Sequence, residues 1–180
     1  MVLMIASDLH GSAFWTKQLL DAFRKEKADK LLLLGDLLFG DLIEPDSDHN
    51  LPGVADQLNA IADRIIAVRG NCDNEEDQML LEFPMMADHV LLDVNGLHLY
   101  AIHGHLWRRN TMPEMGKDSV LVYGHTHIPA CELHEPWLSV NPGSAAFPRG
   151  ESARSYVIVH DRTFTWKTVE GTAYQDYTVD

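Results

Sequence analysis

The chain has few cysteines, few basic residues and no long apolar run. Its 180 residues include 2 cysteines, Cys72 and Cys131, which argues against a disulfide framework in a chain of this size. No stretch reaches the roughly 20 apolar residues that a membrane-spanning helix needs. No basic segment leads into an apolar run of the kind that marks a secretory signal. We therefore expect a cytoplasmic protein without a membrane partner.

The scarcity of basic residues argues against a further class of partner. The 14 Lys and Arg residues are outnumbered by 27 Asp and Glu residues, which gives a formal net charge of −13 with histidine neutral. Binding to long nucleic acids depends on Lys and Arg contacts with phosphates, so we expect no stable nucleic-acid binding. A small anionic substrate is compatible with this charge if bound cations reverse the field locally. The 46% of apolar residues can form one core, and we expect a single domain over residues 1–180.

Strands and helices alternate in the first half of the chain. Residues 2–7, 31–34 and 65–68 are apolar runs that predict buried strands. Ser12 is a suitable N-cap, and two segments place apolar residues on one helical face: Trp15, Leu19, Ala22 and Phe23, then Val54, Leu58, Ile61 and Ala62. Residues 41–52 are polar and rich in turn formers, which predicts an exposed loop. This alternation favours a parallel sheet, with functional groups beyond the carboxyl ends of its strands.

The second half predicts mostly strands. Asn95-Gly96, between residues 90–94 and 97–102, is typical of a two-residue hairpin. Further strands are predicted at residues 120–123, 138–140, 156–160 and 164–169. The short connections suit antiparallel pairing or a second sheet. We favour two packed sheets with helices outside, an α/β sandwich, over a single mixed sheet.

Five short polar segments carry most of the chemistry, and most of them follow an apolar run. They are Asp8-Leu9-His10, Gly35-Asp36, Gly70-Asn71-Cys72-Asp73, His103-Gly104-His105 and Gly124-His125-Thr126-His127. Their carboxylate, carboxamide and imidazole groups suit divalent ions such as Mn, Fe or Zn. The candidate metal ligands are Asp8, His10, Asp36, Asn71, His103, His125 and His127. This set is larger than one ion needs, and a carboxylate such as that of Asp36 can bridge two ions, so we predict a dinuclear metal site.

Spacing and chemistry suggest individual roles within this set. Asn71 can bind a metal through its oxygen while its NH₂ group holds a phosphoryl oxygen. His103 is preferred over His105 as a ligand because it directly follows a predicted strand, and His105 is left to contact substrate or to support the ligands. Glycines 35, 70, 104 and 124 would allow the close backbone approach that crowded ligands require. The other histidines are interpreted as surface or packing residues: His49, His89, His98, His134 and His160.

Together the segments resemble the motifs of the calcineurin-like metallophosphoesterases, which run D-x-H, G-D, G-N-H-D/E, H and G-x-H. The likeness extends from Asp8 to Asn141-Pro142-Gly143-Ser144 and is greatest for the small prokaryotic phosphodiesterase branch. The resemblance implies a four-layer αββα sandwich of two mixed sheets. It also implies Mn²⁺ as a common activating ion, while the mixed oxygen and nitrogen donors leave Zn²⁺, Fe²⁺, Ni²⁺ and Co²⁺ open. One implied metal is held by Asp8, His10, Asp36 and His127, and the other by Asp36, Asn71, His103 and His125.

One position departs from the wider family pattern. Many members carry His where this chain has Cys72, and that His is thought to assist the leaving group. A thiol, with a reference pKa of about 8.5, can donate a proton but is a poorer hydrogen-bond donor than imidazolium. An active role and a role as a small buried residue both remain open for Cys72. Asp73 is interpreted as orienting its loop rather than as an acid–base group. The candidate catalytic residues are Asn71, Cys72, Asp73 and His105.

The predicted reaction is hydrolysis of a small-molecule phosphodiester by a hydroxide that bridges two divalent ions. A phosphomonoesterase acting on nucleotides or proteins is the nearer alternative, and a non-catalytic scaffold of the same fold is a more remote one. Four residues are left open as substrate contacts: Trp107, Arg108, Arg109 and Arg149. A homo-oligomer is also left open, with the aromatic C-terminal strands as its edge.

Overall fold

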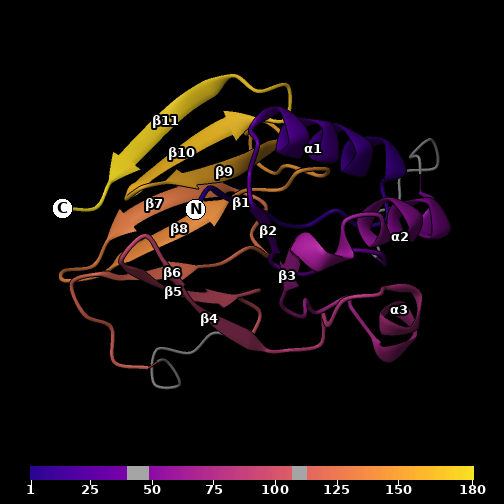
Figure 1. The fold of residues 1–180 in the computed structure, drawn as a ribbon, viewed down its shortest axis with the longest axis horizontal. Coiled ribbons are helices and arrows are strands. Elements are labelled where there is room, and N and C mark those ends of the chain that lie inside the picture. The colour runs from indigo at the N-terminus through magenta and orange to yellow at the C-terminus, as the bar shows by residue number, and fades with distance from the viewer. Residues whose placement is uncertain (40–48, 107–112) are drawn as a thin grey trace.

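The computed structural model describes residues 1–39, 49–106 and 113–180 and contains two packed β-sheets (Figure 1). The six-stranded sheet has the order β11-β10-β9-β1-β2-β3. Its strands are β1 (Leu3–Ala6), β2 (Lys30–Leu33), β3 (Ile65–Ala67), β9 (Ser155–His160), β10 (Thr163–Thr168) and β11 (Ala173–Thr178). β1, β2 and β3 are parallel, whereas β9, β10 and β11 run antiparallel to their neighbours. The parallel half of this mixed sheet confirms what the alternating first half of the sequence predicts.

The second sheet has five strands in the order β4-β5-β6-β8-β7. Its strands are β4 (His89–Val94), β5 (Leu97–Ile102), β6 (Ser119–Val122), β7 (Pro129–Leu133) and β8 (Leu138–Pro142). β4 and β5 form the expected hairpin, with φ of 53° at Asn95 and 80° at Gly96, as a type I′ turn requires. β5, β6 and β8 are parallel, so this sheet is mixed as well. Two mixed sheets, rather than one, confirm the α/β sandwich.

Alternation along the central strands builds two cores. In β1, Leu3 and Ile5 point into the core between the two sheets, whereas Met4 and Ala6 point into the core beneath the helices. All four are fully buried. Strands that are apolar on both faces therefore read as continuous apolar runs, which is why the sequence shows them clearly.

The helices lie beside the six-stranded sheet (Figure 1). They are α1 (Ala13–Lys25), α2 (Leu51–Asn59) and the short α3 (Glu75–Leu80). α1 begins where expected, because the Ser12 side chain accepts a hydrogen bond of 3.3 Å from the backbone N–H of Trp15. Among the described residues no α-helix follows Leu80. The three α-helices therefore form one layer, which covers the six-stranded sheet.

The region around α2 differs from expectation. Residues 41–48 of the predicted loop lie outside the described residues, but Leu51 already belongs to α2, which Asn50 caps. α2 ends at Asn59, so Ile61 and Ala62 are not on its buried face as predicted. They lie in the turn that carries the chain from α2 into β3, which must pair with β2 in register.

One α-helix and two strands were not predicted, nor was the short 3₁₀ helix Ala62–Arg64. α3 has 6 residues, too few for a periodic signal, although the capping box of Asn74 and Asp77 marks its start. β7 begins at Pro129 on a sheet edge, and β11 is an edge strand whose side chains are mostly exposed. Neither edge strand has a buried face that would produce an alternating pattern.

Candidate active site

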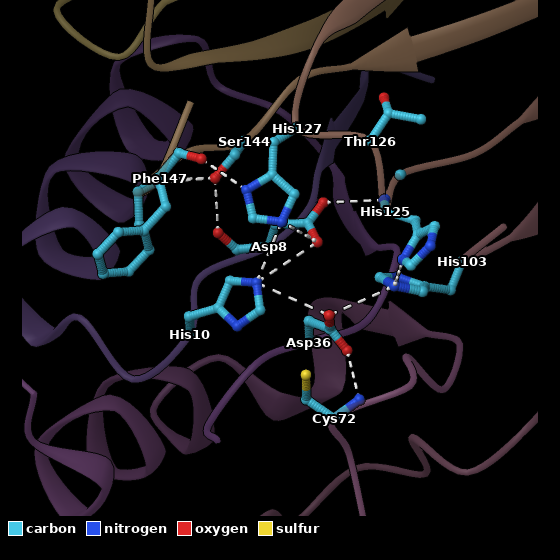
Figure 2. A network of polar contacts seen from close by, with 12 residues as sticks. Asp8, His10, Asp36, Cys72, His103, His125, Thr126, His127, Ser144 and Phe147 are labelled. Carbon is cyan, nitrogen blue, oxygen red and sulfur yellow. Dashed lines mark hydrogen bonds and ion pairs between the residues drawn. The ribbon is translucent and has the colours of Figure 1, made fainter. Parts of the chain in front are cut away.

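The ends of five strands meet at one place, where the structure gathers the candidate ligands (Figure 2). Asp8, Asp36 and Asn71 follow β1, β2 and β3 of the six-stranded sheet. His103 and His125 follow β5 and β6 of the other sheet. Because these strands are parallel within each sheet, their carboxyl ends share one edge of the sandwich.

Two glycines allow the strand ends to approach so closely. A β-carbon on Gly70 would lie 2.0 Å from Asp36 Oδ1, and one on Gly124 would lie 2.0 Å from Ser7 Oγ. Neither distance is compatible with a side chain. Gly70 therefore lets the loop after β3 pass against Asp36, and Gly124 lets the end of β6 reach the end of β1, as the sequence predicts for both positions.

The backbone of the site is unusual at five candidate ligands. The dihedral φ is 59° at Asp8, 44° at His10, 54° at Asp36, 66° at His125 and 61° at His127. Residues other than glycine rarely adopt this left-handed region. Such conformations gather at functional sites, where the surrounding structure holds them in place.

Asp8, His10 and His127 form the first group of side chains. His10 Nε2 lies 3.3 Å from His127 Nε2. Asp8 Oδ1 lies 3.7 Å from His10 Nε2 and 3.3 Å from His127 Nε2. His127 Nδ1 donates to the carbonyl oxygen of Phe147 at 2.5 Å, and His10 Nδ1 donates to that of Phe39 at 3.3 Å. A carbonyl can only accept, so each Nδ1 carries the proton and each Nε2 of the neutral ring presents a lone pair to the centre of the group.

Asp36, Asn71, His103 and His125 form the second group. His103 Nε2 lies 3.4 Å from Asp36 Oδ2, 3.1 Å from Asn71 Oδ1 and 3.2 Å from His125 Nδ1. His103 Nδ1 donates to the carbonyl oxygen of Leu34 at 2.6 Å, so its Nε2 also faces inward with a lone pair. Asp36 Oδ2 lies 3.7 Å from His10 Nε2 as well. The Asp36 carboxylate therefore lies between the two groups (Figure 2).

These donor atoms fit a metal ion. Two unprotonated Nε2 atoms at 3.3 Å cannot hydrogen-bond to each other. Asp8 Oδ1 is buried and has no hydrogen-bond partner in the described part of the chain. In three groups one ligand atom per residue lies within 4.8 Å of the others: Asp8, His10 and His127; Asp8, Asp36 and His103; and His10, Asp36 and Cys72. A cation would satisfy lone pairs that otherwise face one another.

Charge in the site is set by mutual contact between carboxylates and imidazoles. Burial alone would raise the pKa of Asp8 and Asp36, but neighbouring histidines lower both pKa values overall. Burial alone would lower the pKa of His103, but the hydrogen bond and charge of Asp36 and the charge of Asp8 raise it. The pKa of His125 is lowered by burial and then by the charge of His103. The carboxylates therefore stay ionised, and His125 favours its neutral, ligating form.

Residues 1–163 match the family model for the calcineurin-like phosphoesterase superfamily domain. The chain belongs to the calcineurin-like phosphoesterase superfamily. The phosphodiesterase YfcE of Escherichia coli K12 is 41% identical over 157 residues, which cover 87% of this chain and 85% of YfcE. A solved structure of YfcE matches with a TM-score of 0.93 and 35% identity over 100% of both chains. The zinc complex of Vps29 from Entamoeba histolytica, at 18% identity and a TM-score of 0.63 over 100% of both chains, shares the fold alone. The expected metallophosphoesterase fold is confirmed.

In this calcineurin-like phosphoesterase, Asp73 makes its contacts with backbone groups. Its buried carboxylate accepts hydrogen bonds from the backbone N–H groups of Asp36 at 2.8 Å, Leu37 at 2.9 Å and Gly70 at 2.7 Å. The pKa of Asp73 is raised, and burial is the largest cause. The charge of Asp36 raises this pKa further, whereas the backbone hydrogen bonds lower it. Through these hydrogen bonds Asp73 connects the loop after β2 to the loop after β3.

Cys72 and His105 lie beside the ligands. The backbone N–H of Cys72 donates to Asp36 Oδ1 at 2.9 Å, and Asn71 Nδ2 donates to Cys72 Sγ at 3.3 Å. The ring of His105 lies 5.3 Å from that of His103 and 6.2 Å from that of His125, measured between centroids. Burial, followed by the charges of His103 and His125, lowers the pKa of His105. His105 therefore lies next to two candidate ligands and is not among the described residues that line the cavity of His10, Asp36 and Asn71.

The side chains surround a cavity of about 180 Å³. Its described lining is His10, Asp36, Asn71, Cys72, His125, His127 and Arg149. Arg149, which the sequence leaves open, is thus at the site, whereas residues 107–112 with Trp107, Arg108 and Arg109 lie outside the described residues. None of the five histidines interpreted as ordinary is among these lining residues.

The segment after β8 supports the site in ways that spacing does not indicate. Ser144 Oγ donates to the carbonyl oxygen of Asp8 at 2.8 Å and accepts from the backbone N–H of Phe147 at 2.7 Å. Asn141 Nδ2 donates to the carbonyl oxygen of Gly124 at 2.9 Å. The sequence resemblance to the family includes Asn141-Pro142-Gly143-Ser144 but assigns no function to these residues. Neither Cys72 nor Cys131 forms a disulfide within the described residues, and no helix there is long and apolar enough to span a membrane.

Proposed function

We propose that this calcineurin-like phosphoesterase is a metal-dependent phosphodiesterase acting on a small-molecule phosphodiester. The observation that carries the proposal is the position of Asp36, between two groups of donors whose lone pairs face inward. The similarity to YfcE, which is named a phosphodiesterase, supports a diester as the substrate.

The proposed cofactor is a pair of divalent ions that share Asp36. Asp8, His10, Asp36 and His127 would hold one ion, and Asp36, Asn71, His103 and His125 would hold the other. We propose Mn²⁺ as the ion, and the mixed oxygen and nitrogen donors also suit Zn²⁺, Fe²⁺, Ni²⁺ and Co²⁺. When bound, such ions would supply Lewis acidity and an activated water for hydrolysis. Elemental analysis of the purified protein, followed by diester assays with each metal, tests the identity of the ion.

The residues of the Asn71-Cys72-Asp73 loop would have different tasks. With its oxygen 3.1 Å from His103 Nε2, Asn71 has its Nδ2 hydrogens available for a phosphoryl oxygen, since their described partner is a thiol sulfur, a weak acceptor. Cys72 lines the cavity and is proposed to assist the leaving group. Asp73 acts as a positioning residue through its backbone contacts, and His105 supports His103 and His125.

The nearest alternative, a phosphomonoesterase, differs in the charge of the reacting group. A monoester carries more negative charge than a diester, but the buried residues of the site include no Lys or Arg within the described ranges, and Arg149 is exposed. This arrangement favours the diester. Rates on nitrophenyl diester and monoester substrates, measured with the same metal-loaded protein, separate the two.

A higher kcat/KM on the diester supports the proposal, and the reverse preference replaces it with a phosphomonoesterase. Tight metal binding without hydrolysis of either ester, together with stable capture of a partner protein, would instead indicate a scaffold.

A further inference from the structure

Arg149 is placed at the mouth of the cavity. It lines the same 180 Å³ space as Asp36, Asn71 and Cys72. Five candidate ligands, Asp8, His10, Asp36, His103 and His127, are buried, whereas Asn71, His125 and Arg149 are exposed. Arg149 therefore lies on the exposed side of the cavity together with Asn71 and His125, where a bound substrate would extend toward solvent.

The guanidinium of Arg149 makes no hydrogen bond or ion pair among residues 1–39, 49–106 and 113–180. All other described arginines use their guanidinium in hydrogen bonds or ion pairs: Arg24, Arg64, Arg69, Arg154 and Arg162. Arg149 differs from these arginines because its guanidinium contacts neither a carboxylate nor a carbonyl oxygen of the described residues, and it lies at a cavity. A guanidinium in that position is available to a ligand.

The main chain of Arg149 is held firmly to the site. Its N–H donates to the carbonyl oxygen of His127 at 3.2 Å, and its carbonyl oxygen accepts from Ser152 Oγ at 2.6 Å. Arginine matches phosphate and carboxylate oxygens with two parallel hydrogen bonds.

We infer that Arg149 binds a second anionic group, a phosphate or carboxylate carried by one alcohol of the diester. The favoured substrate is then a phosphodiester with a further negative charge at one end. This inference rests on the proposed phosphodiesterase function and specifies its substrate class. Arg149 would act by binding the outer part of the substrate while the diester occupies the deeper position.

Three substrates with one leaving group test the inference. They are 4-nitrophenyl phosphodiesters of ethanol, of 2-phosphoethanol and of 3-hydroxypropionate, so the bond that breaks is the same and the second alcohol is neutral, phosphorylated or carboxylated. For the wild type we expect kcat/KM on the better charged diester to exceed that on the ethyl diester by about tenfold or more, the range of a charged hydrogen-bonded contact. The two charged substrates distinguish a phosphate from a carboxylate ligand.

Arg149→Met should remove the preference for the charged diester, and Arg149→Lys should keep part of it. Arg24→Met is the matched control: it removes one positive charge roughly 16 Å along α1 from Ala13, at the helical rise of 1.5 Å per residue, and should keep the full preference. An equal loss on all three substrates would overturn the inference, because Arg149 would then act on the reacting phosphoryl group. An unchanged preference in Arg149→Met would overturn it too.

Calorimetry separates this inference from the proposed function. Phosphonate analogues of the ethyl and phosphoethyl diesters, in which CH₂ replaces the scissile oxygen, can be titrated into the metal-loaded wild type and Arg149→Met. If the wild type, but not Arg149→Met, binds the charged analogue more tightly than the ethyl analogue, the role of Arg149 is supported. This holds even if no diester is hydrolysed, and in that case only the proposed function fails. Equal affinity for the two analogues in the wild type overturns the role of Arg149.

Discussion

Asp36 has the most demanding position of any single residue in the site. Its Oδ2 faces His10 and His103, its Oδ1 accepts the backbone N–H of Cys72, and its backbone adopts φ of 54°. Each of these contacts makes the carboxylate a fixed point between the two groups of ligands. Removing its charge without changing its shape is therefore the most specific test of a shared ligand.

For Asp36→Asn we expect kcat/KM on an activated diester to fall by at least about 100-fold, since a neutral amide is a poor bridging ligand. The far-UV circular dichroism should be unchanged, because the amide keeps an oxygen for the Cys72 N–H. Asp21→Asn, on the exposed face of α1, is the control and should keep wild-type activity. Full turnover by Asp36→Asn would contradict the shared-ligand site.

Asp73→Asn should reveal a positioning role. The carboxylate accepts three backbone N–H groups, and an amide would turn its NH₂ toward one of them. We expect the free energy of unfolding in urea to fall by about 1–3 kcal/mol, the cost of an unmet buried hydrogen bond, with kcat reduced modestly when metal is saturating. The exposed Asp93→Asn variant should change neither quantity. Unchanged stability with a large loss of kcat would instead indicate acid–base chemistry at Asp73.

At the residue scale, the sequence predicts which side chains gather but not how each is held. Asp8, His10, Asp36, His103 and His127 stand in short loops after apolar runs, so their convergence follows from parallel strands. The carbonyl oxygens of Leu34, Phe39 and Phe147, which orient the imidazoles, carry no side-chain signature. Arg149 reaches the cavity only because the loop after β8 folds back to His127. The metal-ligand roles themselves stay predictions.

At the scale of elements, the site depends on how closely β1 and β6 meet across the two sheets. Gly124→Ala would place a β-carbon 2.0 Å from Ser7 Oγ, and we expect it to lower the free energy of unfolding by about 1–3 kcal/mol through overpacking. Ser7→Gly removes the colliding atoms, so it should relieve part of this loss in the double variant, measured as a coupling energy in urea. Gly116→Ala, with its nearest neighbour at 4.0 Å, is the control. Strictly additive effects of the Gly124 and Ser7 changes would contradict the proposed contact.

Elements were predictable where burial leaves a pattern. The strands before Asp8, Asp36 and His103 have apolar faces against one or both cores. The β4–β5 turn was predictable because Asn95 and Gly96 tolerate the positive φ that a type I′ turn requires. β7 and β11 lie at sheet edges and depend on tertiary pairing. The end of α2 is set by the return of the chain to β3, which periodicity in residues 54–62 does not reveal.

For the whole molecule, the charges of the site couple stability to pH when metal is removed. Burial alone would lower the pKa of His103, but Asp36 and Asp8 raise it above its ordinary value. A group whose pKa is higher in the folded state than in the unfolded state stabilises the folded protein at any pH below its unfolded-state pKa. This stabilisation is lost as the pH rises through the folded-state pKa. His103 should therefore stabilise the metal-free protein in weak acid and less in weak alkali.

The measurement is urea unfolding of the exhaustively chelated wild type and His103→Asn at about pH 5.5 and about pH 8.5, on either side of the ordinary histidine pKa. We expect the gap in unfolding free energy between them to be larger at the lower pH. The exposed pair of His98 and Asp93 offers His98→Asn as a control with little effect at either pH. A gap that is constant or grows with pH would contradict the coupling.

The two-sheet fold was predictable because apolar runs and polar turns alternate along the chain, and the family was predictable because the five polar segments resemble its motifs. A single domain over residues 1–180, cytoplasmic location, oligomeric state and the number and identity of the ions stay predictions, because none of them leaves a distinct mark in the described residues.

Anomalous diffraction at the manganese absorption edge, from crystals grown with Mn²⁺, tests the central claim most directly. We predict two peaks about 3.5–4 Å apart, one beside Asp8, His10 and His127 and one beside Asn71, His103 and His125, with Asp36 between them. A map with no peak at these residues, or with a single peak that Asp36 does not touch, would contradict the account.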